Sequence, residues 1–124
     1  MKVLAPISVG ELIDKITILE IKVQRCADTT QLVNIDRELR ALRNIEAALA
    51  IPKDVAVLRQ QLRSVNEELW NIEDFKRSCE RDQRFDAEFV TAARQVYIKN
   101  DLRARLKREI NRHCHSDIVE EKIY

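Results

Sequence analysis

The sequence has very little glycine and proline: one glycine and two prolines occur in 124 residues. Sheets joined by tight turns and glycine-rich phosphate-binding loops depend on these residues, so their scarcity argues against both. Long helices with short connections need neither residue in quantity. The composition therefore predicts an all-α chain, and its length suits a single domain over residues 1–124.

An excess of charge of one sign is also missing. The chain has 22 basic and 21 acidic residues, a net charge of +1. Proteins that bind nucleic acid or anionic membranes through their general charge carry a clear excess of Lys and Arg. No apolar run reaches the length of a membrane span or a signal peptide. We expect no nucleic-acid partner, no membrane span and a cytoplasmic location.

Cysteine is scarce too, and its spacing fits no known framework. Cys26, Cys79 and Cys114 are odd in number and form no CxxC motif, so reduced thiols are expected. The segment "HCHSD" (113–117) holds metal-binding residue types at a spacing that matches no zinc pattern. No metal site, no cofactor and no catalytic residue is predicted, and whether the protein is an enzyme stays open.

Capping signals and apolar spacing predict four helices. Ser8 with Glu11, and Asp28 with Gln31, are typical of the first two N-termini, and Asp86 is typical of the fourth. Pro52 ends the second helix, and the fourth runs to about His113. The third helix carries a heptad seam made of Val55, Leu58, Leu62, Val65, Leu69 and Ile72.

The short connection at Pro52 indicates how the helices are arranged. It predicts that the second and third helices lie antiparallel, seam to seam. The fold class we expect is an elongated four-helix bundle built on a long antiparallel helical hairpin, with short docked termini. A minor alternative pairs "KVLAPI" (2–7) with the tail "SDIVEEKIY" (116–124) as a small strand.

The first helix is apolar almost all round. Leu12, Ile16 and Leu19 share one arc, whereas Ile18 and Ile21 lie on the other side. Such a helix is either central in the bundle or covered by another protomer. Together with seams long enough to project past a compact core, this pattern predicts a homo-oligomer.

The basic stretch "NDLRARLKREIN" (100–111) of the fourth helix has two faces. At about 100° per residue, some of its charges point away from the apolar arc. The outward set comprises Arg94, Asp101, Arg105, Arg108 and Arg112. The inward set comprises Asn100, Arg103, Lys107 and Asn111. One set of cations is therefore expected in water and the other inside the bundle.

The carboxylates expected to meet Arg103 and Lys107 are Glu20 on the first helix and Glu73 on the third. Two interpretations stay open. The groups form structural ion pairs that fix helix register, or they line a polar pocket that holds an anionic ligand. In the second interpretation Arg103 and Lys107 bind the anion, and Asn100 and Trp70 form the walls.

Four segments carry a resemblance to a known family: "PISVGELIDKITILEIK" (6–22), "LWNIED" (69–74), "VYIKNDLRARLKREIN" (96–111) and "DIVEEKIY" (117–124). They resemble a family of small bacterial helical proteins of unknown function, met among cell-envelope polysaccharide and glycosyltransferase genes. The resemblance implies a glycosyltransferase or another envelope-assembly protein as partner. It implies no activity and transfers no catalytic residue.

Two function hypotheses follow. The first is an oligomeric interaction or accessory protein linked to surface-glycan biosynthesis of the lipopolysaccharide type. The alternative is a small all-α enzyme or binding protein that takes a phosphorylated or carboxylated metabolite in a polar pocket. There, Glu20 or Glu73 would serve as acid–base or orienting groups.

Overall fold

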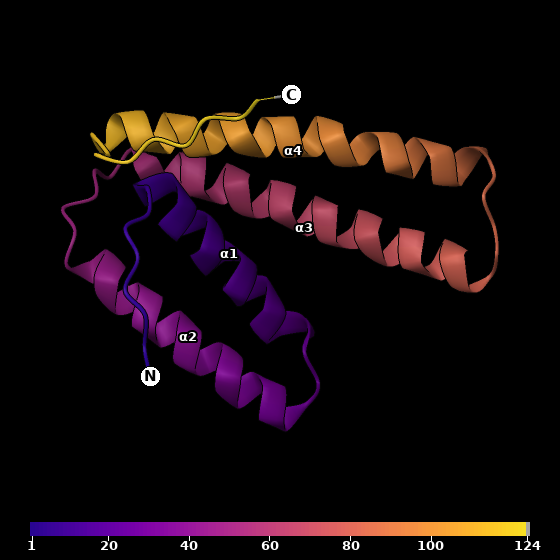
Figure 1. The fold of residues 1–124 in the computed structure, drawn as a ribbon, viewed down its shortest axis with the longest axis horizontal. Coiled ribbons are helices and arrows are strands. Elements are labelled where there is room, and N and C mark those ends of the chain that lie inside the picture. The colour runs from indigo at the N-terminus through magenta and orange to yellow at the C-terminus, as the bar shows by residue number, and fades with distance from the viewer. Residues whose placement is uncertain (124) are drawn as a thin grey trace.

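The computed structural model describes residues 1–123 and contains four helices (Figure 1). They are α1 (Val9–Arg25), α2 (Thr29–Ala47), α3 (Val55–Arg81) and α4 (Ala87–His113). The predicted all-α bundle is confirmed. Neither residues 2–7 nor residues 116–123 form a strand, so the alternative pairing of the two termini is wrong for the part of the chain described.

The three predicted N-caps are present and explain where the helices begin. Ser8 Oγ accepts a hydrogen bond from the backbone N–H of Glu11 at 3.0 Å. Asp28 Oδ1 accepts from Gln31 N–H at 2.9 Å, and Asp86 Oδ1 accepts from Phe89 N–H at 3.2 Å. Each bond satisfies one of the free amide groups of a first helical turn.

Helix α1 is central, because it packs on α2, α3 and α4 (Figure 1). Leu12, Ile16 and Leu19 pack with Leu39 of α2, and Ile13 packs in a second cluster with residues of α3 and α4. Ile21, which the sequence suggested might meet another protomer, is 0% exposed within this single chain. The oligomer argument from Ile21 is therefore wrong, because α1 has its partners inside the monomer.

The long antiparallel hairpin exists, but between different helices from those predicted. The heptad seam of α3 packs against Leu106 and Ile110 of α4 and Ile13 of α1. Helix α2 packs on α1, and within residues 1–123 its backbone does not come close to that of α3, which it meets through the ion pair of Glu46 with Arg59. The seven residues 48–54 form a connection long enough to move the chain from one side of α1 to the other. The second helix therefore ends at Ala47, before the predicted end at Pro52, and Pro52 lies within the connection.

The α3–α4 hairpin has two unequal parts. In the base, residues 55–70 of α3 and 100–113 of α4 pack with α1, and the core cluster ends at Leu69 and Leu102. The projecting half, residues 71–99, extends beyond α1 and α2 (Figure 1). Cys79 is the one buried residue among these described positions. Half of the hairpin therefore consists of two helices that have only each other to pack on.

The segment after α4 turns back and runs along that helix (Figure 1). Arg108 Nη2 donates to both carboxylate oxygens of Glu121 at 2.8 Å, and Lys122 Nζ pairs with Asp101 at 2.7 Å. This confirms a docked C-terminal segment. Residues 1–7 are exposed and form neither helix nor strand, so the predicted docking of both termini is wrong for the N-terminal one.

Candidate functional site

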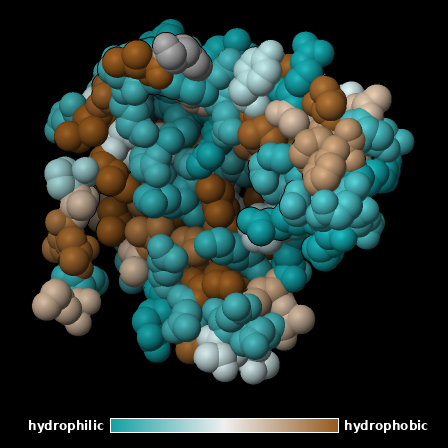
Figure 2. Space-filling model, turned by 45° about the vertical axis from the view of Figure 1, so that its right-hand side comes forward, coloured by the Kyte–Doolittle hydropathy of each residue, from teal (hydrophilic) through white to brown (hydrophobic). Residues whose placement is uncertain are grey.

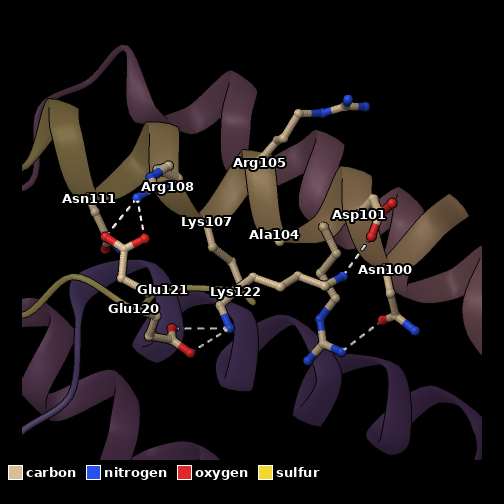
Figure 3. A pocket seen from close by; sticks show the side chains of 11 residues that line it. Asn100, Asp101, Ala104, Arg105, Lys107, Arg108, Asn111, Glu120, Glu121 and Lys122 are labelled. Atoms are coloured by element: carbon tan, nitrogen blue, oxygen red, sulfur yellow. Dashed lines mark hydrogen bonds and ion pairs between the residues drawn. The ribbon is translucent and has the colours of Figure 1, made fainter. Parts of the chain in front are cut away.

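The two-sided character of α4 is confirmed. The inward side chains are shielded: 29% of Arg103 and 15% of Lys107 is exposed, and Asn111 is buried. Arg105 and Arg108 are exposed, and Figure 3 shows Arg105 pointing away from the neighbouring helices. The cations of one helix therefore lie in two different electrostatic environments.

Arg103 meets a carboxylate that is completely buried. Its Nε and Nη2 donate to Oδ1 and Oδ2 of Asp14 at 2.9 and 2.5 Å, in a bidentate pair. Asp14 is 0% exposed and also accepts from Asn66 Nδ2 at 2.9 Å. The same amide nitrogen donates to Thr17 Oγ1 at 2.9 Å. The network joins α1, α3 and α4 at one point, so it fixes their register.

One turn further along α4, Lys107 pairs with Glu11 of α1 and, at 3.2 Å, with Glu120 of the docked segment. Next to it, Asn111 Oδ1 accepts from the backbone N–H of Gly10 at 2.6 Å. A Cβ at position 10 would lie 2.9 Å from that oxygen and closer still to the Lys107 carbonyl. The sole glycine of the chain is needed here because α1 and α4 are in backbone contact.

Both inward cations are held in the charged state. The hydrogen bonds that Arg103 donates to Asp14 raise the pKa of Arg103 more than burial lowers it. For Lys107, burial lowers the pKa, but the hydrogen bond with Glu11 and the nearby charge of Asp14 together outweigh it, so its pKa is raised. Neither group is suited to give up its proton near neutral pH.

The predicted carboxylate partners were wrong. Glu20 pairs with Arg43 of α2 at 3.0 Å and with Arg63 of α3 at 3.5 Å. Glu73 pairs with Lys76 at 3.4 Å, within its own helix. Glu20 lies on the side of α1 that faces α2, and Glu73 lies in the projecting half. The prediction failed because it took the apolar arc of α1 that contains Glu20 as the side facing α4, whereas Gly10, Glu11 and Asp14 lie on that side.

Trp70 also lies away from Arg103 and Lys107. Its ring is 5.8 Å from Cζ of Arg25, and it lines a different pocket, beside the α1–α2 connection. Asn100 is where it was predicted, next to Arg103, with Oδ1 3.5 Å from Nη1. Of the six predicted residues, Asn100, Arg103 and Lys107 thus share one site, whereas Glu20, Glu73 and Trp70 are elsewhere.

The sequence contains a signal for the true partners that the prediction missed. Gly10, Asp14, Thr17 and Ile21 recur at steps of four, three and four, and all four are buried. They form one narrow face of α1 that consists of a glycine, two polar residues and an isoleucine. Asn100, Arg103, Lys107 and Asn111 recur at similar steps on α4, so the two faces match when the helices lie antiparallel.

The docked segment covers a groove of about 610 Å³ along α4 (Figure 3). Lys107 and Arg108 on its walls pair with Glu120 and Glu121 from the segment itself. Ser8 Oγ also donates to Glu120, at 3.2 Å. Carboxylates of the chain therefore occupy the positions where an anionic ligand would bind.

The polar groups of this site pair with one another. Among the described residues, no buried side-chain nitrogen or oxygen lacks a hydrogen-bond partner. Residues 1–123 contain no group of three His, Cys, Asp or Glu side chains placed to hold a metal ion. This arrangement favours the first interpretation, in which ion pairs fix helix register.

Membrane insertion by a helix is also unsupported: across residues 1–123, no helix has the length and apolar character needed to span a bilayer.

Comparisons with known proteins place the chain in a family without defining its activity. No curated protein and no solved structure matches it. A family model described as a family of unknown function, DUF6165, matches residues 1–124. The match spans the predicted segments of resemblance and everything between them. The chain therefore belongs to the family of unknown function DUF6165.

Proposed function

We propose that this protein is a non-catalytic helical interaction protein that self-associates through the projecting half of its α3–α4 hairpin. The observation that carries the proposal is the surface of that half. Phe85, Val90, Tyr97 and Ile98 are 40–57% exposed, and Cys79 is the one buried residue among positions 71–99. On the face shown in Figure 2, hydrophobic side chains lie among hydrophilic ones instead of being covered.

The spacing of these side chains supports a helical partner. Val90 and Tyr97 are seven residues apart on α4, so they lie on one stripe, outside the seam that faces α3. A hairpin of two helices can bury one seam between them, and a second seam needs another helix.

A second copy of this chain is the simplest partner. Every copy presents the same stripe, and two-fold symmetric dimers are the commonest protein assemblies. Two projecting halves packed together would form a four-helix arrangement, the usual way for helical hairpins to bury both faces.

The setting of this function is surface-glycan assembly. The resemblance to small bacterial proteins met among cell-envelope polysaccharide genes supports a cytoplasmic role beside a glycosyltransferase or another envelope-assembly protein. An oligomeric accessory protein would hold such enzymes together without contributing catalytic groups. This part of the proposal is tested by measuring binding of purified surface-glycan glycosyltransferases from the same organism to the immobilised protein.

The alternative, an anionic metabolite in the groove beside α4, has less support. Arg103 and Lys107 are both ion-paired to carboxylates of the chain, and a ligand would have to displace Glu120 to reach Lys107. The groove carries cations, but their charge is already balanced.

The self-association is tested by light scattering coupled to size-exclusion chromatography. We expect the wild type to be a dimer or larger, and Val90→Lys/Tyr97→Lys to be a folded monomer by circular dichroism. Val33→Lys is the matched control, because Val33 on α2 is 58% exposed but lies outside the projecting half. A monomeric wild type at high concentration, or a double variant that stays oligomeric, would contradict the proposal.

A further inference from the structure

A second pocket, distinct from the groove beside α4, lies where the α1–α2 connection meets α3. Its volume is about 530 Å³, within the roughly 300–1,000 Å³ range of small-molecule sites. The lining side chains used below are Lys22 and Arg25 of α1, Gln31, Asn34 and Ile35 of α2, and Trp70 of α3. Three helices thus contribute to one site.

The charge of this pocket is not balanced by the protein. Within residues 1–123, neither Lys22 nor Arg25 forms an ion pair with a carboxylate, and no carboxylate lines the pocket. Arg25 Nη1 donates to the neutral amide of Asn71 at 2.7 Å, so its charge is not neutralised. In the groove beside α4, by contrast, Lys107 and Arg108 are paired with Glu120 and Glu121.

The remaining walls offer a flat face and hydrogen-bonding edges. Trp70 is half-buried, and the guanidinium of Arg25 lies 5.8 Å from its ring centroid. An indole face binds planar bases or the apolar face of a sugar ring. The amides of Gln31 and Asn34 can both donate and accept, so they suit hydroxyl groups or base edges.

From this combination we propose that the pocket beside Trp70 binds a phosphorylated ring compound, a nucleotide or a sugar phosphate. The ring packs on Trp70 in place of the Arg25 guanidinium, and Gln31 and Asn34 contact its polar edge. Lys22 and the displaced Arg25 bind the phosphate. The pocket lies outside the projecting half. A test of this proposal is therefore separate from the test of the proposed self-association.

Trp70 makes the proposal directly measurable, because it is the only tryptophan of the chain. A ligand stacked on it is expected to change the intrinsic fluorescence. The probes are uridine diphosphate and glucose 1-phosphate, with uridine, glucose and inorganic phosphate as their separate parts. A parallel titration of free N-acetyltryptophanamide corrects for light absorbed by the nucleotide.

We expect saturable fluorescence changes with at least one phosphorylated ring compound, and binding at least about tenfold weaker for its separate parts. Lys22→Met is expected to weaken binding by about tenfold or more, since it removes one charge-assisted contact. Arg105→Met is the matched control: that cation is exposed on α4, far from the pocket lining, and the variant should bind like the wild type. Trp70→Leu, followed by calorimetry, should also lose binding.

The two phosphorylated probes distinguish the sources of the ring. Tighter binding of uridine diphosphate assigns a nucleotide, and tighter binding of glucose 1-phosphate assigns a sugar phosphate. The proposal is overturned if neither binds at millimolar concentration, or if inorganic phosphate binds as tightly as both. Equal binding by Lys22→Met and Arg105→Met would also overturn it, because the ligand would then lie elsewhere.

Discussion

The base and the projecting half of the α3–α4 hairpin are made from the same two helices but are stabilised in different ways. In the base, α1 adds a third layer, and its buried polar groups pair with Arg103 and Asn66. In the projecting half, no third helix is present in the chain as described, and Cys79 is the single buried residue there. Polar pairs therefore fix the register of the helices in the base. In the projecting half, the register of α3 and α4 depends on the packing of the seam between them.

If the proposed self-association is correct, this difference assigns folding to the base and recognition to the projecting half. Buried ion pairs contribute little net stability compared with apolar packing, but they penalise wrong alignments strongly. They lie where three helices meet and where alignment matters. The half without them keeps apolar side chains such as Val90 and Tyr97 available for a partner.

The largest expected effect comes from breaking the polar network of the base. Asp14→Ala leaves the partly buried Arg103 guanidinium without its carboxylate. We expect the free energy of unfolding to fall by about 3–5 kcal/mol, measured by urea denaturation. A loss below about 1 kcal/mol would show that the base does not depend on this pair.

The matched control for Asp14→Ala replaces both partners. Asp14→Leu/Arg103→Met removes the two charges together, and buried pairs replaced by apolar residues are often no less stable. Most of the lost stability should return. If the double variant is as unstable as Asp14→Ala, the loss reflects the other contacts of Asp14 rather than the unpaired cation.

A further prediction tests the close contact between α1 and α4. In an ordinary helix, replacing glycine by alanine stabilises by about 1 kcal/mol. At Gly10 the added Cβ would clash with Asn111 and with the Lys107 backbone, so we expect Gly10→Ala to destabilise by about 2 kcal/mol. Thermal denaturation measures the change, and Gln24→Ala, at an exposed position of the same helix, should change stability by under about 0.5 kcal/mol.

A pair of truncations in α3 compares the two halves directly. Leu62→Ala in the base removes a side chain that is 0% exposed and should cost about 2–5 kcal/mol. Ile72→Ala in the projecting half removes a half-buried one and should cost about 1 kcal/mol in dilute solution. If the projecting half is covered by a second copy, the cost of Ile72→Ala rises with protein concentration. If Leu62→Ala and Ile72→Ala lower the free energy of unfolding equally at every protein concentration, the two halves are not distinct.

The smallest effect lies at the turn that ends the projecting half. The hydrogen bond from Arg84, followed by that from Phe89 N–H, lowers the pKa of Asp86. A lowered pKa gives stability that is present above the unfolded pKa of about 3.9 and is lost as pH falls through the folded pKa. Asp86→Asn keeps the N-cap but not the charge.

The melting temperatures of Asp86→Asn and wild type should therefore differ slightly at pH 7 and converge in strong acid. A difference that persists in acid would assign the effect to the cap instead of the ion pair.

Local features of the fold could be predicted from the sequence because they depend on neighbours along the chain. The caps at Ser8, Asp28 and Asp86 and the two-sided face of α4 all follow from spacing, and all were confirmed. The pairing of the helices could not be predicted in this way. A short apolar connection containing Pro52 is compatible with a hairpin and equally with a crossing to the other side of α1.

The error in the site has its own cause. Glu20 lies within the apolar arc of α1, which was expected to face the inward cations, but that side of α1 faces α2, and Glu73 lies in the projecting half. With α1 against α4, Asp14 and Glu11 meet those cations instead. The choice depends on which apolar seam is complementary to which, and that depends on packing in three dimensions that periodicity does not encode.

The first turn of α1 has a consequence for how the chain acquires its fold during synthesis. Val9 N–H donates to Ser116 Oγ and Gly10 N–H to Asn111 Oδ1, partners 107 and 101 residues further along the chain. During vectorial synthesis on the ribosome, α1 is made before α4, so these two amides can form their native hydrogen bonds only after α4 and the segment behind it have emerged. The central helix is therefore expected to reach its final state last, so that premature release or truncation within α4 would leave it exposed to proteases.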